Sequence, residues 1–347
     1  MTKVYVGMSG GVDSSLSAAL LVEQGYDVTG VYMKNWTQDL PGMQCPWAAD
    51  LADAKRVAVH LGIPFRVFDF QTEYKQLVVD YMLKEYRAGR TPNPDIMCNQ
   101  EVKFGLFLQA ALKAGADMIA TGHYAASSGR HLLRAKNESK DQTYFLYRVT
   151  GDAIKQTIFP LAEYVSKQDV RCAAAERGIA TAAKRDSQGI CFVGTVGIKD
   201  FLRQYVETTS GNIIERETGK VLGKHDGAIF YTFGQRHGLN VGGGLPYYVV
   251  GKDMAKNEVY VSRNLNARGF FADRIDLGSL HWINQAPRQD KTYLMRVRHR
   301  APLMPAYVEL SDDGAIVRPV EAERAVAPGQ SIVIYDEREC LGGGIVK

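Results

Sequence analysis

Short apolar runs alternate with longer amphipathic stretches over the first 125 residues of the chain. The runs that predict buried strands are 3–8, 28–33, 65–70 and 117–121. The stretches with apolar residues at helical spacing are 14–24, 50–61, 73–88 and 101–114. Alternation of this kind predicts an α/β domain in which helices cover both faces of a parallel sheet.

The pattern changes in the second half of the chain. Residues 143–183 keep a helical pattern, which is clearest at 167–177. Short β-rich segments then follow between Gly, Asn and Pro turns, at 211–214, 228–232, 247–250, 258–262 and 293–298. We therefore expect three domains, which are the α/β domain at 1–200, a small β-rich central domain at 201–271 and a C-terminal β-barrel-like domain at 272–347.

Composition narrows the class of protein. Hydrophobic residues make up 46% and charged residues 23%, which is typical of globular proteins. Lys and Arg exceed Asp and Glu by 42 − 38 = 4, which excludes a polybasic protein but allows a nucleic-acid binder with a local basic face. The sequence shows neither an apolar run of about 18 residues nor a signal peptide, so we expect no membrane span and a cytoplasmic location.

The number and spacing of the cysteines argue against a disulfide framework and against a structural zinc site. The chain has five cysteines, an odd and sparse set that does not suit a disulfide framework, and it has no CxxC pair that suits structural zinc. We expect three of them to have only structural roles: Cys45, Cys172 and Cys340. Cys98 and Cys191 lie in segments with other polar residues and are candidates for chemistry.

The strongest local motif is Gly-Met-Ser-Gly-Gly-Val-Asp-Ser-Ser at 7–15, between a predicted strand and a predicted helix. Small residues let backbone N–H groups approach an anion closely, and the helix N-terminus adds a positive pole. The sequence lacks the Gly-Lys-Ser/Thr ending of the P-loop. The motif favours a phosphate-binding loop, and the alternative is a tight turn with a serine cap.

Residues 89–99 carry two prolines and predict a stiff loop. Within it, Asn93, Asp95, Cys98 and Asn99 place a carboxylate, two amides and a thiol within seven residues. These groups suit a pocket for a polar, planar ligand. The alternative is an Asx-rich turn with a buried cysteine.

Cys191 follows Lys184 and Arg185, and nearby cations favour a thiolate. A thiolate can attack another sulfur, forming a disulfide or accepting a persulfide. The alternative is a core cysteine beside Phe192 and Val193.

Taken together, these motifs resemble the tRNA-specific 2-thiouridylases (the MnmA/TrmU family), members of the N-type ATP pyrophosphatase (PP-loop) superfamily. The resemblance covers nearly the whole chain and is carried by residues 7–15, 34–36, 89–99, 120–124, 140–147, 186–194, 231–239 and 340–344. It implies a tRNA-uridine 2-sulfurtransferase that uses ATP, with Mg²⁺ accompanying the nucleotide, to adenylate the C2 oxygen of the wobble uridine. Sulfur from a protein persulfide then replaces that oxygen.

The resemblance also implies roles for individual residues. ATP binding falls on Gly7, Met8, Ser9, Gly10, Gly11, Val12, Asp13, Ser14, Met33 and Gly122. Contacts with the target base fall on Asn93, Pro94 and Asp95. Contacts with tRNA fall on Lys140, Asp141, Gln142, Arg298 and His299, the last at a position where the family often has Tyr.

The implied chemistry gives two thiols different tasks. Cys191 carries the persulfide and Cys98 is the nucleophile and resolving thiol, so the cycle ends with a Cys98–Cys191 disulfide. Asp95 is a candidate general acid or base, or only a loop-capping carboxylate. Asp13 is a candidate Mg²⁺ ligand, and no metal site belonging to the protein alone is expected. The expected partners are tRNA and a persulfide donor, either a cysteine desulfurase or a relay protein, and the chain is expected to act as a monomer.

A basic segment supports the RNA interpretation. Arg296, Arg298 and Arg300 alternate, so in a strand they would share one face that suits phosphates. The alternative for such a run is a solvated surface. Two other functions remain open on sequence alone: an amidating synthetase of the same superfamily, in which the cysteines are dispensable, and a nucleotide-regulated RNA-binding protein without catalysis.

Overall fold

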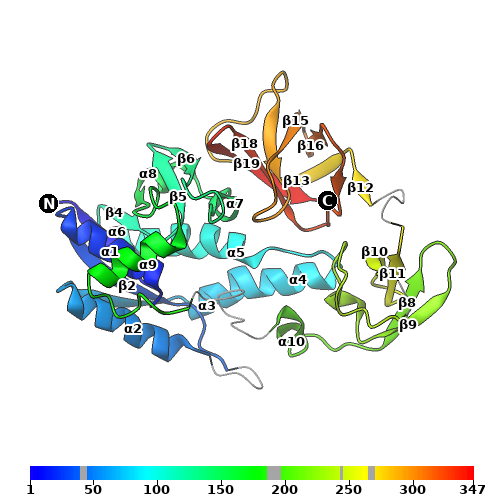
Figure 1. Cartoon of the computed structure of the whole chain (residues 1–347), viewed down its shortest axis with the longest axis horizontal. Helices are drawn as coiled ribbons and strands as arrows, with labels where there is room; N and C mark the ends of the chain where they lie inside the picture. Colours follow the sequence, from blue (N-terminus) through cyan, green and yellow to red (C-terminus); the bar gives the residue numbers. More distant parts are fainter. Residues whose placement is uncertain (40–44, 186–196, 243–244, 265–269) are drawn as a thin grey trace.

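The computed structural model describes residues 1–39, 45–185, 197–242, 245–264 and 270–347 (Figure 1). Cys191 therefore lies outside the described residues. The chain forms a parallel α/β sheet, a small central sheet and a C-terminal barrel, in that order along the sequence. The predicted fold class is confirmed in all three parts.

The N-terminal sheet has five parallel strands in the order β3-β2-β1-β4-β7. Their bounds are β1 Lys3–Gly7, β2 Asp27–Lys34, β3 Phe65–Asp69, β4 Met118–Ala120 and β7 Thr157–Ile158. Side chains alternate between the two faces, so Val4 and Val6 pack with the helices of one face and Tyr5 packs with those of the other. Both faces are thus buried, as the apolar runs predicted.

The helices of this domain follow the predicted alternation closely. On the face that Val4 and Val6 share lie α1 Val12–Glu23, α2 Trp47–His60 and α9 Lys167–Glu176. The other face is covered by two long helical stretches that each contain a π-type segment, α3 Gln71–Tyr74 with η1 Lys75–Asp80 and α4 Tyr81–Arg87, and α5 Pro94–Met97 with η2 Cys98–Leu106 and α6 Phe107–Lys113. Shorter helices are α7 Thr143–Leu146, α8 Gly151–Lys155, α10 Ile198–Leu202 and the 3-10 turn η3 Ala228–Phe230.

The prediction of a stiff loop through residues 89–99 is wrong in its second half. A helix begins at Pro94 and continues through Cys98 into η2. Proline is tolerated at the first helical position because its missing N–H would have had no partner there. Asp95, Cys98 and Asn99 therefore lie on a helix, which fixes their relative directions.

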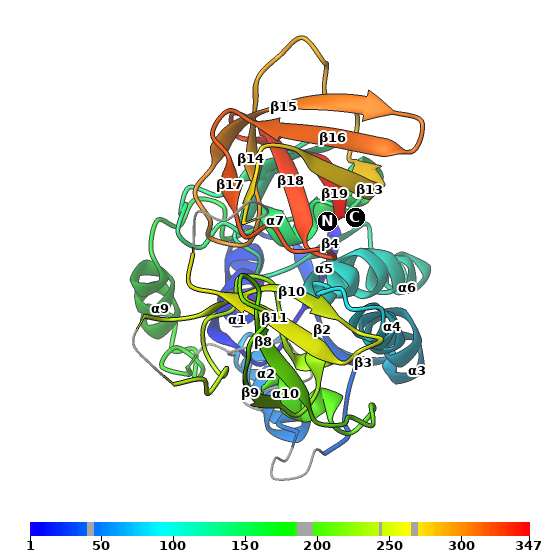
Figure 2. The same cartoon turned by 90° about the vertical axis from the view of Figure 1, so that its right-hand side faces the viewer.

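The central domain is a four-stranded sheet in the order β10-β11-β8-β9. Its strands are β8 Gly211–Glu215, β9 Val221–His225, β10 Tyr248–Asp253 and β11 Glu258–Ser262. Ile213, Val249 and Val259 form the centre of its own small core. In Figure 1 this sheet lies beyond the end of α4 and next to α10, away from the parallel sheet, and in Figure 2, which faces that side, it lies in front.

The C-terminal domain is a closed six-stranded barrel, in the order β13-β16-β15-β14-β18-β19 with β19 pairing back to β13. Its strands are β13 Ile275–Trp282, β14 Tyr293–Arg296, β15 Met304–Ser311, β16 Gly314–Pro319, β18 Ser331–Asp336 and β19 Glu339–Val346. A short ribbon of β12 Phe271–Ala272 and β17 Glu323–Arg324 lies beside it. Gly343 allows close strand contact, since a Cβ there would lie 2.0 Å from the carbonyl oxygen of Ile332.

A hairpin of the first domain joins the barrel. This hairpin, β5 Ala125–Ser128 and β6 His131–Arg134, pairs through β6 with β19, with Leu132 opposite Cys340. Tyr144 donates a hydrogen bond to the carbonyl oxygen of Ser331 at 2.9 Å, in a buried position. The α/β domain and the barrel are therefore connected by a shared sheet and buried hydrogen bonds.

The predicted arginine strand is wrong. Strand β14 ends at Arg296, and Arg300 has a left-handed backbone with φ of 64°. Arg296 is 5% exposed and forms a buried ion pair with Asp141 at 2.9 Å. The three arginines therefore share no strand face, and Arg296 is unavailable to phosphates.

Candidate active site

The glycine-rich loop lies at the point where the strand order of the parallel sheet reverses. It follows β1, and the segment Thr121–Gly122–His123 follows the adjacent strand β4. A Cβ on Gly122 would lie 2.8 Å from the backbone nitrogen of Ser14, so the two segments touch. Ligands of open α/β sheets bind in the crevice at this switch point.

The loop's own hydrogen bonds hold it in a tight turn. The Ser9 N–H donates to Ser14 Oγ at 3.1 Å, and the Ser15 hydroxyl donates to the Gly11 carbonyl at 2.8 Å. Gly10 has φ of 74°, and a Cβ there would lie 2.3 Å from the carbonyl oxygen of Asp50. The start of α1 has no side-chain cap, which leaves its first N–H groups for an anion.

Other residues assigned to nucleotide binding lie within this loop or next to it. A Cβ on Gly7 would lie 3.0 Å from the Met33 methyl, so Met33 packs against the end of β1. Met8 and Val12 are buried among the core residues beside the sheet. These positions are compatible with a nucleotide site, and the individual contacts with ATP stay predictions.

The Asp13 carboxylate is already engaged. Lys167 donates to both of its oxygens at 2.7 Å, and the Tyr124 hydroxyl donates to one of them at 2.8 Å. The nearby Asp50 is paired in turn with Lys184 at 2.7 Å. The described residues include no cluster of three His, Cys, Asp or Glu side chains that could hold a metal. These paired carboxylates do not fit a resident Mg²⁺ site.

One face of the helix that begins at Pro94 carries three polar residues, Asp95, Asn99 and Lys103, spaced four apart. Residues at this spacing lie one above another on a helix. Burial raises the pKa of the Asp95 carboxyl, and the positive charge of Lys103 opposes that shift. A carboxyl with a raised pKa is suited to hold or accept a proton near neutral pH.

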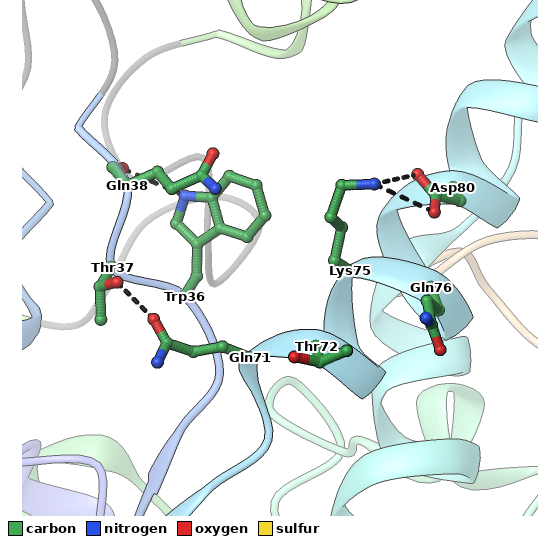
Figure 3. A pocket seen from close by; sticks show the side chains of 8 residues that line it. All are labelled: Trp36, Thr37, Gln38, Gln71, Thr72, Lys75, Gln76 and Asp80. Atoms are coloured by element: carbon green, nitrogen blue, oxygen red, sulfur yellow. Dashed lines mark hydrogen bonds and ion pairs between the residues drawn. The ribbon is translucent and has the colours of Figure 1, made fainter.

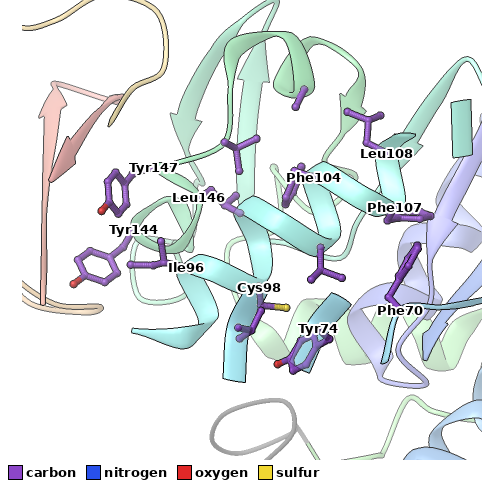
Figure 4. Packing of buried hydrophobic residues seen from close by; sticks show 14 of the residues in the cluster. Phe70, Tyr74, Ile96, Cys98, Phe104, Phe107, Leu108, Tyr144, Leu146 and Tyr147 are labelled. Carbon is purple, nitrogen blue, oxygen red and sulfur yellow. The ribbon is translucent and has the colours of Figure 1, made fainter. Parts of the chain in front are cut away.

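Cys98 lies beside this face but inside the hydrophobic core. It is 2% exposed and packs in a cluster with Tyr74 and Ile96 (Figure 4). The sequence suggested a thiol standing beside the pocket, whereas the structure buries it between helices. Reaction of this thiol therefore requires a local movement, and its assigned role stays a prediction.

The segment at 140–142 contacts the residues that follow β4 and lines the cavity beside them. Lys140 and Gln142 face the same cavity, and Gln142 accepts a hydrogen bond from the Tyr124 N–H at 2.9 Å. Asp141 lies between them with its side chain buried, paired with Arg296 and accepting from the Thr143 hydroxyl at 2.9 Å. Its carboxylate thus faces the protein interior, which does not suit a direct contact with tRNA.

The barrel contributes the last wall. The His299 ring packs against the Phe145 ring, with centroids 4.5 Å apart and the ring planes tilted by 41°, and Arg300 lines the same cavity. Burial lowers the pKa of His299 to about 4, with further lowering by Arg300 and Arg296. The imidazole is therefore neutral at pH 7. Arg298 was predicted with His299 but does not line this cavity.

These side chains enclose one cavity of about 440 Å³. It brings together the phosphate loop, the Asp95 face and the 140–142 segment, which are far apart in the sequence. Asn93, Pro94, Met33 and Gly122 were also predicted for the site but do not line it. The lining residues that were assigned no role are Asp50, Lys103, His123, Tyr124 and Phe145, whereas Arg300 was expected on an RNA-facing strand.

Two of these unassigned residues, His123 and Lys103, lie next to sequence features that could have identified them as site residues. His123 directly follows Gly122 in a motif that was recognised, and Lys103 lies four residues after Asn99 on the same helix. Burial and Lys103 lower the pKa of His123 well below its usual value, so it is a neutral hydrogen-bonding group, paired with the Thr121 hydroxyl at 2.8 Å. Asp50 gave no local signal, because only the fold brings it to the loop.

Lys184 and Arg185 also line the cavity, just before the segment that contains Cys191. Lys184 bonds to Asp50 and Asp53, at 2.7 and 2.6 Å, so much of its charge is already balanced. The predicted effect of these cations on Cys191 concerns a thiol outside the described residues.

A separate pocket of about 310 Å³ lies between residues 36–38, which follow β2, and the helical stretch of α3 and η1 (Figure 3). Its polar groups pair with one another: Lys75 with Asp80 at 3.0 Å, and Thr37 with Gln71. It holds none of the residues assigned to chemistry. In the described part of the chain, no helix is both long and apolar enough to cross a bilayer.

Family models match three consecutive parts of the chain. Residues 2–195 match the tRNA methyl transferase HUP domain, residues 199–263 the tRNA methyl transferase PRC-barrel domain, and residues 272–346 the aminomethyltransferase beta-barrel domain. Among solved structures, a 4-thiouridine synthetase–RNA complex with bound ATP is 17% identical with a TM-score of 0.38, over 59% of this chain and 50% of that one. So distant a likeness says nothing about function.

Curated relatives match over nearly their whole length. The tRNA-specific 2-thiouridylase MnmA of Enterococcus faecalis is 44% identical over 99% of this chain and 95% of its own. Those of Bacillus subtilis and Pseudomonas syringae are each 44% identical, over 99% and 100% of this chain and 95% and 94% of their own. The chain belongs to the family of tRNA-specific 2-thiouridylases.

Proposed function

We propose that this protein is an ATP-dependent tRNA-uridine 2-sulfurtransferase that acts on the wobble uridine. The observation that carries the proposal is the single cavity in which an anion-binding loop faces the polar helix of Asp95 and basic residues from two domains. Such a cavity can hold a nucleotide and an extruded base at the same time. Membership of the 2-thiouridylase family supports the reaction class.

The first step is adenylation. The uridine C2 oxygen attacks the α-phosphorus of ATP, a new P–O bond forms, and the bond to the β-phosphate breaks to release pyrophosphate. The loop between β1 and α1 supplies backbone N–H groups that hold the phosphates in line. Adenylation converts a poor leaving oxygen into AMP. Any Mg²⁺ would accompany the nucleotide, since the protein's own carboxylates are paired.

The second step transfers sulfur. The terminal sulfur of a Cys191 persulfide attacks C2, the C2–O bond breaks, and AMP leaves with the oxygen. Cys98 then attacks the Cys191 sulfur, which breaks the S–S bond and leaves sulfur on C2. The product enzyme holds a Cys98–Cys191 disulfide, which a dithiol reductant must open. A reducing compartment such as the cytoplasm suits this cycle.

Asp95 is proposed to exchange a proton with the base. Its raised pKa and its place on the cavity wall support this role. Asn93 and Pro94 are proposed to act at the start of the same helix, where they fix its position beside the base.

Lys140, Gln142 and His299 are proposed to bind tRNA within the cavity. Arg298 is proposed to contact the sugar-phosphate backbone of the tRNA outside it. Asp141 is proposed to contribute indirectly: its ion pair with Arg296 fixes the backbone that presents Lys140 and Gln142 to the cavity. A persulfide donor must reach Cys191 from solvent. We propose that the protein acts as a monomer.

Mass spectrometry of tRNA nucleosides tests the proposal. The purified protein is incubated with ATP, Mg²⁺, unmodified tRNA and a persulfide source, and 2-thiouridine is quantified. The Cys191→Ser and Cys98→Ser variants should each lose product while still binding ATP, and Cys172→Ala, an exposed cysteine away from the cavity, should remain active. Thiolation at the normal rate by Cys191→Ser would overturn the mechanism, and absence of 2-thiouridine with the parent protein would overturn the function.

A further inference from the structure

The side chain of Asn99 carries a buried oxygen with nothing to bond to. Asn99 is 2% exposed and lines the cavity. Its Oδ1 has no hydrogen-bond partner within the described parts of the chain. A buried acceptor left without a partner costs about 1–3 kcal/mol, so proteins rarely keep one without a reason.

The orientation of this amide is fixed by its other end. The Nδ2 group donates to the backbone carbonyl oxygen of Phe145 at 3.2 Å. A flipped amide would set two carbonyl oxygens against each other, so the bond to Phe145 assigns the nitrogen and leaves Oδ1 at the opposite end. The free acceptor is thus a property of the fold and does not depend on an arbitrary choice of rotamer.

Phe145 links this acceptor to the barrel. Its backbone carbonyl accepts from the Asn99 amide, and its ring packs at a tilt against the His299 ring. His299 has a buried Nδ1 that also lacks a partner among the described residues. A polar helix and an aromatic pair therefore meet in this cavity, which the loop at 7–15 also lines.

The free acceptor suits the edge of a base that carries an N–H. Lys103, Lys140 and Arg300 also line the cavity and can bind phosphates, but Asn99 Oδ1 only accepts hydrogen bonds, so a phosphate oxygen leaves it unsatisfied. A planar ring can stack near Phe145 and His299 while its edge meets the free acceptor. The ligand must then present an N–H at that edge.

We propose that Asn99 Oδ1 accepts a hydrogen bond from N3–H of the target uracil, and that Asn99 is a specificity-determining residue for this reaction. Uracil carries an N–H between its two carbonyls, whereas cytosine carries an unprotonated nitrogen there, which would face Oδ1 as a second acceptor. The proposal rests on the proposed function and deepens it, since Asn99, rather than Asn93, reads the base. A site with a buried acceptor rejects a ligand that lacks the matching donor.

The test compares two substrates with two enzymes. The substrates are the same tRNA with uridine or 3-deazauridine, in which C–H replaces N3–H, at the wobble position. The enzymes are the parent chain and Asn99→Leu, which keeps the side-chain volume but removes the acceptor. The intrinsic reactivity of each base is common to both enzymes, so it cancels in the ratio of the two kcat/KM ratios.

We expect the parent enzyme to prefer uridine over 3-deazauridine by about tenfold or more beyond the preference of Asn99→Leu, the size of one buried hydrogen bond. Equal preferences in the two enzymes would overturn the role of Asn99. Failure of the proposed function would differ, because the parent enzyme would then thiolate neither tRNA. If Asn99→Leu does not fold by circular dichroism, Asn99→Ala, which removes atoms without adding any, takes its place in the same comparison.

Discussion

The buried ion pair between Asp141 and Arg296 gives the sharpest prediction about how the barrel is attached. The Arg296 Nη1 to Asp141 Oδ2 distance is 2.9 Å, and the two side chains are 6% and 0% exposed. At an effective dielectric of about 20, two unit charges at this distance attract by about 6 kcal/mol, and desolvation offsets part of that. Arg296→Met removes the nearer cation and leaves the buried carboxylate with Arg134 at 4.0 Å and the Thr143 hydroxyl, so we expect a loss of about 3 kcal/mol in the free energy of unfolding, the lower end for a broken buried pair.

Urea unfolding can measure this loss for the parent, Arg296→Met, Asp141→Asn and the double variant. The double variant should lose less than the sum of the single variants, because it leaves neither charge uncompensated. Arg318→Met is the matched control, since Arg318 pairs with Glu309 at 2.6 Å but both side chains are more than 40% exposed. We expect that control to lose less than about 1 kcal/mol.

Two results would refute the reasoning about this pair. One is an Arg296→Met variant as stable as Arg318→Met, which would mean that burial does not distinguish the two pairs. The other is strict additivity in the double variant, which would mean that Arg296 and Asp141 do not stabilise each other. A chain of several domains can unfold in more than one transition, so the loss is read from the transition in which the barrel unfolds.

Three further predictions concern the loop, the cysteines and Asp95. Gly10→Ala should weaken ATP binding by about tenfold or more in calorimetry, since left-handed strain of about 1–2 kcal/mol adds to the clash with the Asp50 carbonyl. Gly129→Ala, also left-handed but in open space, should leave ATP binding unchanged. In a timed thiol-labelling assay Cys172, which is exposed, should react rapidly and Cys340, whose pKa burial raises, slowly; equal rates would contradict the burial. Because the folded pKa of Asp95 is raised, its stabilising contribution is present at low pH and lost as pH rises, so Asp95→Asn should gain stability over the parent at pH 8 but not at pH 3, measured by thermal unfolding.

The fold was predictable where burial is repeated along the chain. Apolar runs such as Val4–Val6 and the amphipathic helices around Leu16 and Val57 carry a regular period, because each contacts a continuous core. The β5–β6 hairpin was not predicted, since Ala125–Ser128 is short and half polar and is stabilised mainly by pairing with the distant strand β19. Tertiary pairing of this kind leaves little local pattern.

The site was predictable in its motifs but not in its partners. The loop at 7–15 can be recognised from the sequence, because close approach of the backbone to an anion requires small residues such as glycine and serine. The burial of Arg296 depends on its ion pair with Asp141, which is 155 residues away in the sequence. The alternation of arginines carries no sign of that pair, and it predicted a strand face that does not exist. Cys98 likewise carries a polar context in sequence, while its burial follows from how the helices pack around Tyr74.

Transfer of the oxygen atom tests the central claim most directly. A tRNA labelled with ¹⁸O at C2 of the wobble uridine is reacted with ATP and a persulfide source, and the released AMP is analysed by mass spectrometry. If the C2 oxygen is adenylated before sulfur replaces it, each AMP formed with 2-thiouridine carries one ¹⁸O. AMP that takes its oxygen from water, while 2-thiouridine still forms, would contradict the account.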